Sequence, residues 1–126
     1  AMLALTMAVG MRMGYARYTA VRRGEVNPKY YELYKGEEPE GLRKISRHYV
    51  NLLEVPPLFY VVCIIAYVTG QSSTLLLALA WLYVLLRVAH SLIHLGPNIV
   101  INRFRVFVLS AVVLTVLMVV VFLGVI

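Results

Sequence analysis

The chain has 126 residues, of which 61% are hydrophobic and 14% charged, and its net charge is +6. Soluble domains are nearer half apolar, so this composition indicates a membrane protein. All six acidic residues lie at or before Glu54, and the basic residues flank apolar segments. This placement of the basic residues indicates that they set membrane topology, and we prefer that interpretation to binding of nucleic acid.

The first predicted helix covers residues 2–22 and is the weakest membrane segment. Arg12 and Arg17 interrupt it. They leave an uninterrupted apolar part of only about ten residues, whereas a spanning helix needs about 20. We therefore expect that residues are missing before Ala1. The charges follow the apolar run, which is unlike a signal peptide.

The three connections differ in charge. The first, residues 22–45, carries six Lys or Arg residues among five glutamates, the second (GQSS, 70–73) has none, and the third, 95–105, is again basic. The positive-inside rule places the first and third in the cytoplasm, and a bacterial chain would then lie in the inner membrane. Three tyrosines of the first connection either anchor it at the membrane interface or cap a site; they are Tyr30, Tyr31 and Tyr34.

Three further helices are predicted over residues 46–69, 74–95 and 99–125, each with roughly the 20 apolar residues that a spanning helix needs. The fold class is therefore an all-α integral membrane protein, in which residues 1–126 form a single bundle of four transmembrane helices. Pro56–Pro57 predicts a kink in the second helix. Cys63 is the only cysteine and lies in an apolar run, where burial disfavours a thiolate, so we do not expect it to be a nucleophile.

Polar residues remain where the second helix enters the membrane. Arg47, Asn51 and Glu54 are spaced i, i+4 and i+7, so an arginine, an amide and a carboxylate share one helix face. Ionisable groups at membrane depth are costly and usually face a partner or a wet cavity. This face is therefore a candidate wall of a site.

A second polar face lies where the third helix leaves the membrane. Arg87, His90 and His94 are spaced i, i+3 and i+7, and Arg103 opens the fourth helix. The second helix enters from the side on which the third one leaves, so both faces converge at one depth. Arginines outnumber the single carboxylate Glu54 there, which suits an anionic ligand that also carries an amine.

Plainer interpretations of these residues stay open. Glu54 could pair with Arg87 and only fix helix packing, and Arg103 with Arg105 could be topology anchors that reach the headgroups. His90 and His94 could in principle hold a metal. With only one other histidine in the chain, no Asp and no Cys nearby, we expect no metal site.

The second-helix motif resembles a known family. R-x-x-x-N-x-x-E-x-x-P-x-F is similar to the signature of the MAPEG family, the membrane-associated proteins in eicosanoid and glutathione metabolism. The stretch RVAHSLIHLG at 87–96, followed by Arg103, is similar to the third helix of prostaglandin-synthase members. The matching residues of the motif are Arg47, Asn51, Glu54, Pro57 and Phe59.

The resemblance implies a homotrimer that binds glutathione as a cosubstrate between neighbouring subunits. It implies a glutathione-dependent transferase or peroxidase acting on lipophilic electrophiles or lipid hydroperoxides. Arg103 matches the catalytic arginine that stabilises the thiolate, and Arg22 and Arg23 match, loosely, a basic pair supplied by a neighbouring subunit. The residues implied to contact glutathione from the second and third helices are Arg47, Asn51, Glu54, Arg87, His90 and His94.

Three positions depart from the family pattern. His94 and Phe107 stand where tyrosines are expected, and Phe104 stands where a serine is expected. A generic thiol reaction is therefore a better expectation than a specific eicosanoid activity. The alternatives are a non-catalytic lipid-binding member of the family and a small multidrug transporter. Such transporters carry an essential glutamate in the first helix, and this first helix has no acid.

Overall fold

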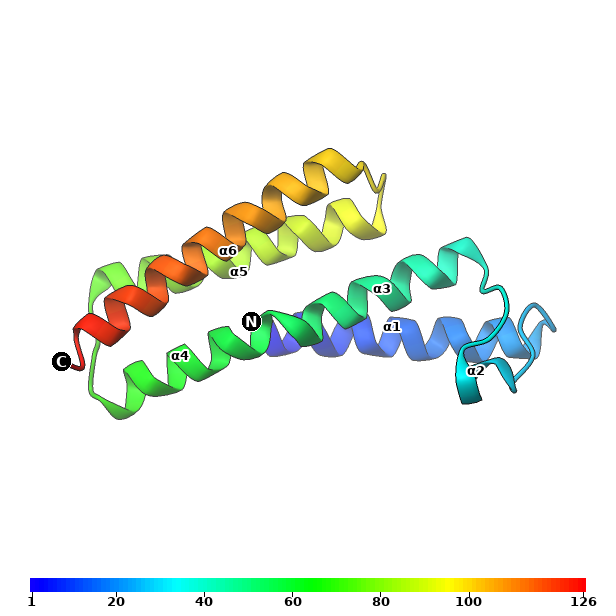
Figure 1. Ribbon diagram of the computed structural model, residues 1–126, viewed down its shortest axis with the longest axis horizontal. Coiled ribbons are helices and arrows are strands. Elements are labelled where there is room, and N and C mark those ends of the chain that lie inside the picture. Colours follow the sequence, from blue (N-terminus) through cyan, green and yellow to red (C-terminus); the bar gives the residue numbers. More distant parts are fainter.

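The computed structural model describes residues 1–126 and contains helices and no strands. Two helix pairs make up the bundle: α5 lies along α6, and α1 lies along α3 (Figure 1). The pairs join where α3 meets α5 and α4 meets α6. The helices are α1 (Met2–Arg22), α2 (Tyr30–Leu33), α3 (Glu40–Glu54), α4 (Pro56–Val68), α5 (Thr74–Leu95) and α6 (Val100–Leu123).

Three helical stretches are long and apolar enough to cross a membrane. They are Glu40–Val68, which joins α3 and α4, Thr74–Leu95 and Val100–Leu123. The composition thus predicted correctly an all-helical integral membrane protein. Helix α1 is not among these stretches, and it packs mainly along α3.

The second membrane stretch is a broken helix. Helix α3 ends at Glu54 and α4 begins at Pro56, so the kink predicted from the two prolines is present. Proline has no N–H to continue the hydrogen-bond ladder of a preceding helix, but it fits the first turn of a new one. Helix α3 also begins at Glu40, earlier than the residue 46 expected from hydropathy.

Local signals set the start of α5 and the turn between α5 and α6. The side chain of Ser73 caps α5 by accepting a hydrogen bond from the Leu76 amide at 3.2 Å. Between the helices, Asn98 adopts a left-handed conformation with φ +53°, which asparagine tolerates better than most residues. This tight turn places the start of α6 beside the end of α5.

Apolar side chains fill the middle of the bundle. Phe59 of α4 stacks on Tyr83 of α5 with ring centroids 4.7 Å apart, and Leu117 and Val121 of α6 are buried against them. Burial of such side chains fixes how α3 and α4 are rotated against α5 and α6. That rotation decides which polar side chains of α3 face the other pair.

The tyrosines of the first connection form a separate cluster on α1. The Arg17 guanidinium lies 5.1 Å from the Tyr31 ring centroid and 5.8 Å from that of Tyr34. Burial, together with the nearby Glu38 carboxylate, raises the pKa of the Tyr31 phenol above its usual value, so the phenol stays protonated at neutral pH. The cluster lines none of the cavities described below.

A pair of glycines in α1 gives a test of the α1–α3 contact. A Cβ on Gly10 would lie 2.9 Å from a ring carbon of Tyr49, whereas a Cβ on Gly14 would meet nothing within 4 Å. Gly14→Ala should stabilise the protein by up to about 1 kcal/mol through helix propensity. Gly10→Ala should be less stable than Gly14→Ala by about 1–3 kcal/mol, because it overpacks the contact. Unfolding in mixed detergent micelles would measure both, and equal effects would contradict the packing.

Candidate functional site

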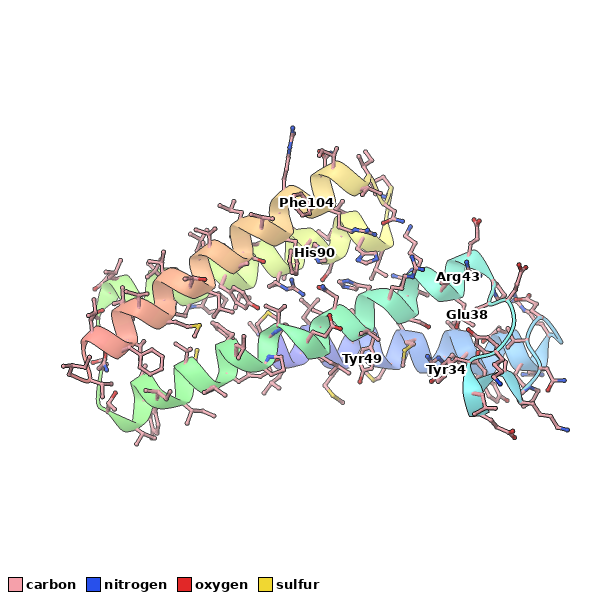
Figure 2. All side chains as sticks on the ribbon, in the orientation of Figure 1. Tyr34, Glu38, Arg43, Tyr49, His90 and Phe104 are labelled. Carbon is pink, nitrogen blue, oxygen red and sulfur yellow. The ribbon has the colours of Figure 1, made fainter.

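A cavity of about 290 Å³ lies between α3, α5 and α6, at the bundle end that carries the 22–44 connection. We call it the inner cavity. Helix α3 contributes one wall and α5 the opposite one, where His90 lies on the face toward α3 (Figure 2). Six of the residues predicted from the sequence line it together. The full lining is Arg47, Asn51, Glu54, His90, His94, Val100, Arg103, Phe104 and Phe107.

A second cavity of about 550 Å³ adjoins the first, and we call it the outer cavity. The two share Arg47, His94 and Arg103 as common walls. No hydrophobic residue lines the outer cavity, and four of its side chains are Lys or Arg against one acid. Such a surface draws anions toward the inner cavity. The outer lining is Glu40, Gly41, Arg43, Lys44, Arg47, His94, Asn98 and Arg103.

Arg103 is held in place from one side only. Its Nη1 donates to Asn98 Oδ1 at 2.8 Å and lies 3.3 Å from Nε2 of His94. Asn98 is the left-handed residue of the α5–α6 turn, so the turn itself positions the guanidinium. The remaining guanidinium nitrogens make no hydrogen bond within the chain, which leaves them available to a ligand.

Arg87 lies behind the cavity wall. It is fully buried, and its Nη2 donates to Asn51 Oδ1 at 2.5 Å and to the Asn51 carbonyl at 3.3 Å. Its guanidinium also lies 5.7 Å from the centroid of the Phe107 ring. Because the Asn51 oxygen is taken by Arg87, the Asn51 amide nitrogen remains to donate to a ligand.

Glu54 and Arg87 do not pair. Glu54 is exposed in the inner cavity and makes no hydrogen bond or ion pair, while Arg87 donates to Asn51 through Nη2 alone. The structure therefore does not contain the ion pair between Glu54 and Arg87 that would only fix helix packing. Its charge faces the cavity together with those of Arg47 and Arg103.

His48 is a residue of the site that sequence reasoning missed. It is fully buried on the face of α3 toward α5, with its ring centroid 4.8 Å from that of His94 and 5.6 Å from that of His90. Its spacing from Leu52, four residues on and also buried, marks it as facing the bundle. The i, i+4 spacing of His48 and Leu52 on one face of α3 was the sequence signal that could have identified His48.

The sequence model of the MAPEG family matches residues 1–123, nearly the whole chain. The chain belongs to the MAPEG family. No curated protein and no solved structure gives a significant match to it. Membership supports a membrane protein with a role related to glutathione or eicosanoids in general.

In this MAPEG chain, Arg22 and Arg23 lie apart from the inner cavity. Both are exposed at the end of α1, and Arg23 forms a weak surface pair with Glu25 at 3.9 Å. Arg23 also lines a third cavity of about 540 Å³ between α1 and α3, which shares no residue with the inner cavity. A single subunit therefore does not bring this basic pair to the other predicted residues.

The three departures from the MAPEG pattern all lie at the inner cavity. His94, Phe104 and Phe107 line it, and no hydroxyl group does. Hydrogen bonding to a sulfur or carboxylate in this cavity would therefore come from guanidinium, amide and imidazole groups.

Proposed function

We propose that this MAPEG protein is a glutathione-dependent membrane transferase or peroxidase acting on lipophilic electrophiles or lipid hydroperoxides. The observation that carries the proposal is the inner cavity, where the exposed Arg47, the half-buried Arg103 and the unpaired Glu54 carboxylate face one space. Glutathione carries two carboxylates, one ammonium and a thiol. The charges of Arg47, Arg103 and Glu54 complement that pattern.

Each side chain has a role in binding that its chemistry supports. Arg47 makes no hydrogen bond within the chain and can bind a carboxylate with both arms of its guanidinium. Glu54 can accept the glutathione ammonium, and the Asn51 amide nitrogen can donate to a peptide carbonyl. Arg87 acts through Asn51 by fixing the orientation of its amide.

Arg103 is the group proposed to activate the thiol. A guanidinium beside sulfur favours the charged form and lowers the thiol pKa, which supplies a nucleophile at neutral pH. In conjugation, the sulfur forms a bond to an electrophilic carbon and the leaving group departs with the bonding electrons. In peroxide reduction, the thiolate sulfur attacks the terminal oxygen, the O–O bond breaks, and the alkoxide leaves and takes up a proton to become the alcohol. The glutathione sulfenic acid then reacts with the thiol of a second glutathione, which gives the disulfide and water.

The proposed assembly is a homotrimer in which α1 completes a four-helix subunit. A neighbouring subunit would then supply Arg22 and Arg23, which lie away from the inner cavity of their own chain. Large apolar side chains stay exposed along α6, among them Val112, Val116 and Val119, and they would face lipid or neighbouring subunits. We propose that connections 22–45 and 95–105 face the cytoplasm, in the inner membrane of a bacterial cell.

Glutathione should raise the thermal stability of the detergent-purified protein in a saturable way. A ligand that binds only the folded state stabilises it by about 2.7 kcal/mol at 100 times its dissociation constant. Glu54→Gln should weaken this effect about tenfold or more, because the amide cannot balance the ammonium charge. Glu37→Gln, the same change at an exposed residue outside both cavities, is the matched control. No shift at millimolar glutathione in the native protein would argue against the proposal.

The second candidate is a non-catalytic lipid-binding protein. The absence of any hydroxyl from the inner cavity favours it, since Phe104 and Phe107 add apolar surface in its place. A chromogenic aryl halide and a fluorescent fatty acid would separate the two candidates. Turnover of the first supports an enzyme, whereas binding of the second without turnover of any electrophile supports the lipid-binding protein.

A further inference from the structure

The three histidines of the chain form one buried cluster. His48 comes from α3, and His90 and His94 come from successive turns of α5. Their side chains are 0%, 2% and 6% exposed, and one ring nitrogen from each lies within 4.8 Å of the other two. In all three rings, Nδ1 is buried and has no hydrogen-bond partner. Three buried polar atoms without partners at one place require an explanation.

The hydrogen bonds around His48 determine which of its nitrogens carries the proton. Ser91 Oγ donates its one hydrogen to the Arg87 carbonyl at 2.8 Å, so it can only accept from His48 Nε2 at 2.9 Å. His48 therefore carries its proton on Nε2 and leaves a bare lone pair on Nδ1. A histidine that binds a metal through one nitrogen and donates from the other to a neighbouring oxygen has this same arrangement.

The two histidines of α5 are less constrained. His90 makes no hydrogen bond within the chain, so either of its nitrogens can supply a lone pair. His94 accepts a long contact of 3.3 Å from Arg103, whose shorter bond at 2.8 Å goes to Asn98. A competing ligand for His94 would displace only the weaker of these two contacts.

We propose that His48, His90 and His94 bind a divalent first-row transition metal, with Zn²⁺ as the best match. Imidazole nitrogen is a preferred zinc ligand, and three protein ligands with one open position are typical of catalytic zinc sites. His90 and His94 line the inner cavity, so the open position faces that cavity. The expectation of no metal counted one further histidine without placing it, and the structure brings this residue, His48 of α3, beside the two histidines of α5.

Geometry and charge both allow this site. Zinc–nitrogen bonds of about 2.0–2.1 Å require the three ligand nitrogens to approach to roughly 3.4 Å of one another. In the structure these nitrogens already lie within 4.8 Å of one another. Three neutral imidazoles add no charge, but Arg87 and Arg103 are positive. Glu54 and an anion in the open position, such as hydroxide, offset them. The proposal goes beyond the glutathione function and does not depend on it.

The experiment is metal titration of protein purified without a histidine tag and stripped with a chelator. Zinc affinity would be measured by competition with a chromogenic chelator, and the Co²⁺ form by its visible absorption. We expect one metal per chain and an intense spectrum typical of four-coordinate cobalt. Ser91→Ala should weaken binding about 10–100-fold, as changes around metal-bound histidines do.

Ligand variants should lose more than this. His48→Ala and His94→Tyr should abolish measurable binding, and tyrosine at position 94 is the residue that the family pattern favours. Cys63→Ser removes the only thiol of the chain and should leave the affinity unchanged. Helicity by circular dichroism would show that each variant is folded, and His94→Tyr decides the outcome if His48→Ala is not. Native protein without bound metal, or equal binding by the histidine variants, would overturn the site.

Discussion

Replacing Arg103 with alanine is expected to lower kcat/KM for glutathione conjugation by roughly 10²- to 10³-fold, the loss typical for removal of one donor from a charge-stabilising site. The guanidinium is positioned by Asn98 and faces the inner cavity with free donors. Without it, the bound thiol pKa should rise toward the value of about 8.5 of a free cysteine. Activity of the variant should therefore recover as pH increases. Steady-state kinetics across pH would measure both effects.

Arg105→Ala is the matched control for this experiment. Arg105 lies two residues further along α6, is exposed, and lines neither cavity. Its loss removes the same charge from the same helix, so activity should stay within about twofold if only local contact with the thiol matters. Equal losses for both variants would indicate a general electrostatic effect, and unchanged activity of Arg103→Ala would refute the proposed role.

Replacing Asn51 with leucine is expected to destabilise the protein by about 2–3 kcal/mol, because it leaves the buried Arg87 guanidinium without its main acceptor. Arg87→Met in the same chain should restore most of this loss, since the pair is then replaced by apolar groups of similar volume. Unfolding of single and double variants in mixed micelles would give the coupling energy of the two residues.

Asn102→Leu is the control for Asn51→Leu. Asn102 is exposed on α6 and its side chain makes no hydrogen bond, so the change should stay within about 0.5 kcal/mol. If Asn51→Leu were as mild as this control, Arg87 would not depend on Asn51. Additive effects of the Asn51 and Arg87 changes would lead to the same conclusion.

The sequence was enough to predict the membrane class and most of the polar residues that line the inner cavity. Hydropathy along the chain is a local property, and it indicated the helices, while Pro56–Pro57 indicated the break between α3 and α4. Periodicity placed Arg47, Asn51 and Glu54 on one face, and the charge pattern put this face at the same end as His90, His94 and Arg103. These residues do meet in one cavity.

Only the tertiary structure decided how these groups divide between wall and interior. Arg87 shares a helical face with His90 and His94, yet it lies behind Asn51, while Glu54 faces the cavity unpaired. His48 joins two histidines more than 40 positions away in the chain. The rotation of α3 against α5, set by apolar packing such as Phe59 on Tyr83, determines each of these outcomes. The spacing of residues within one helix does not determine that rotation, because the rotation depends on side chains of both helices.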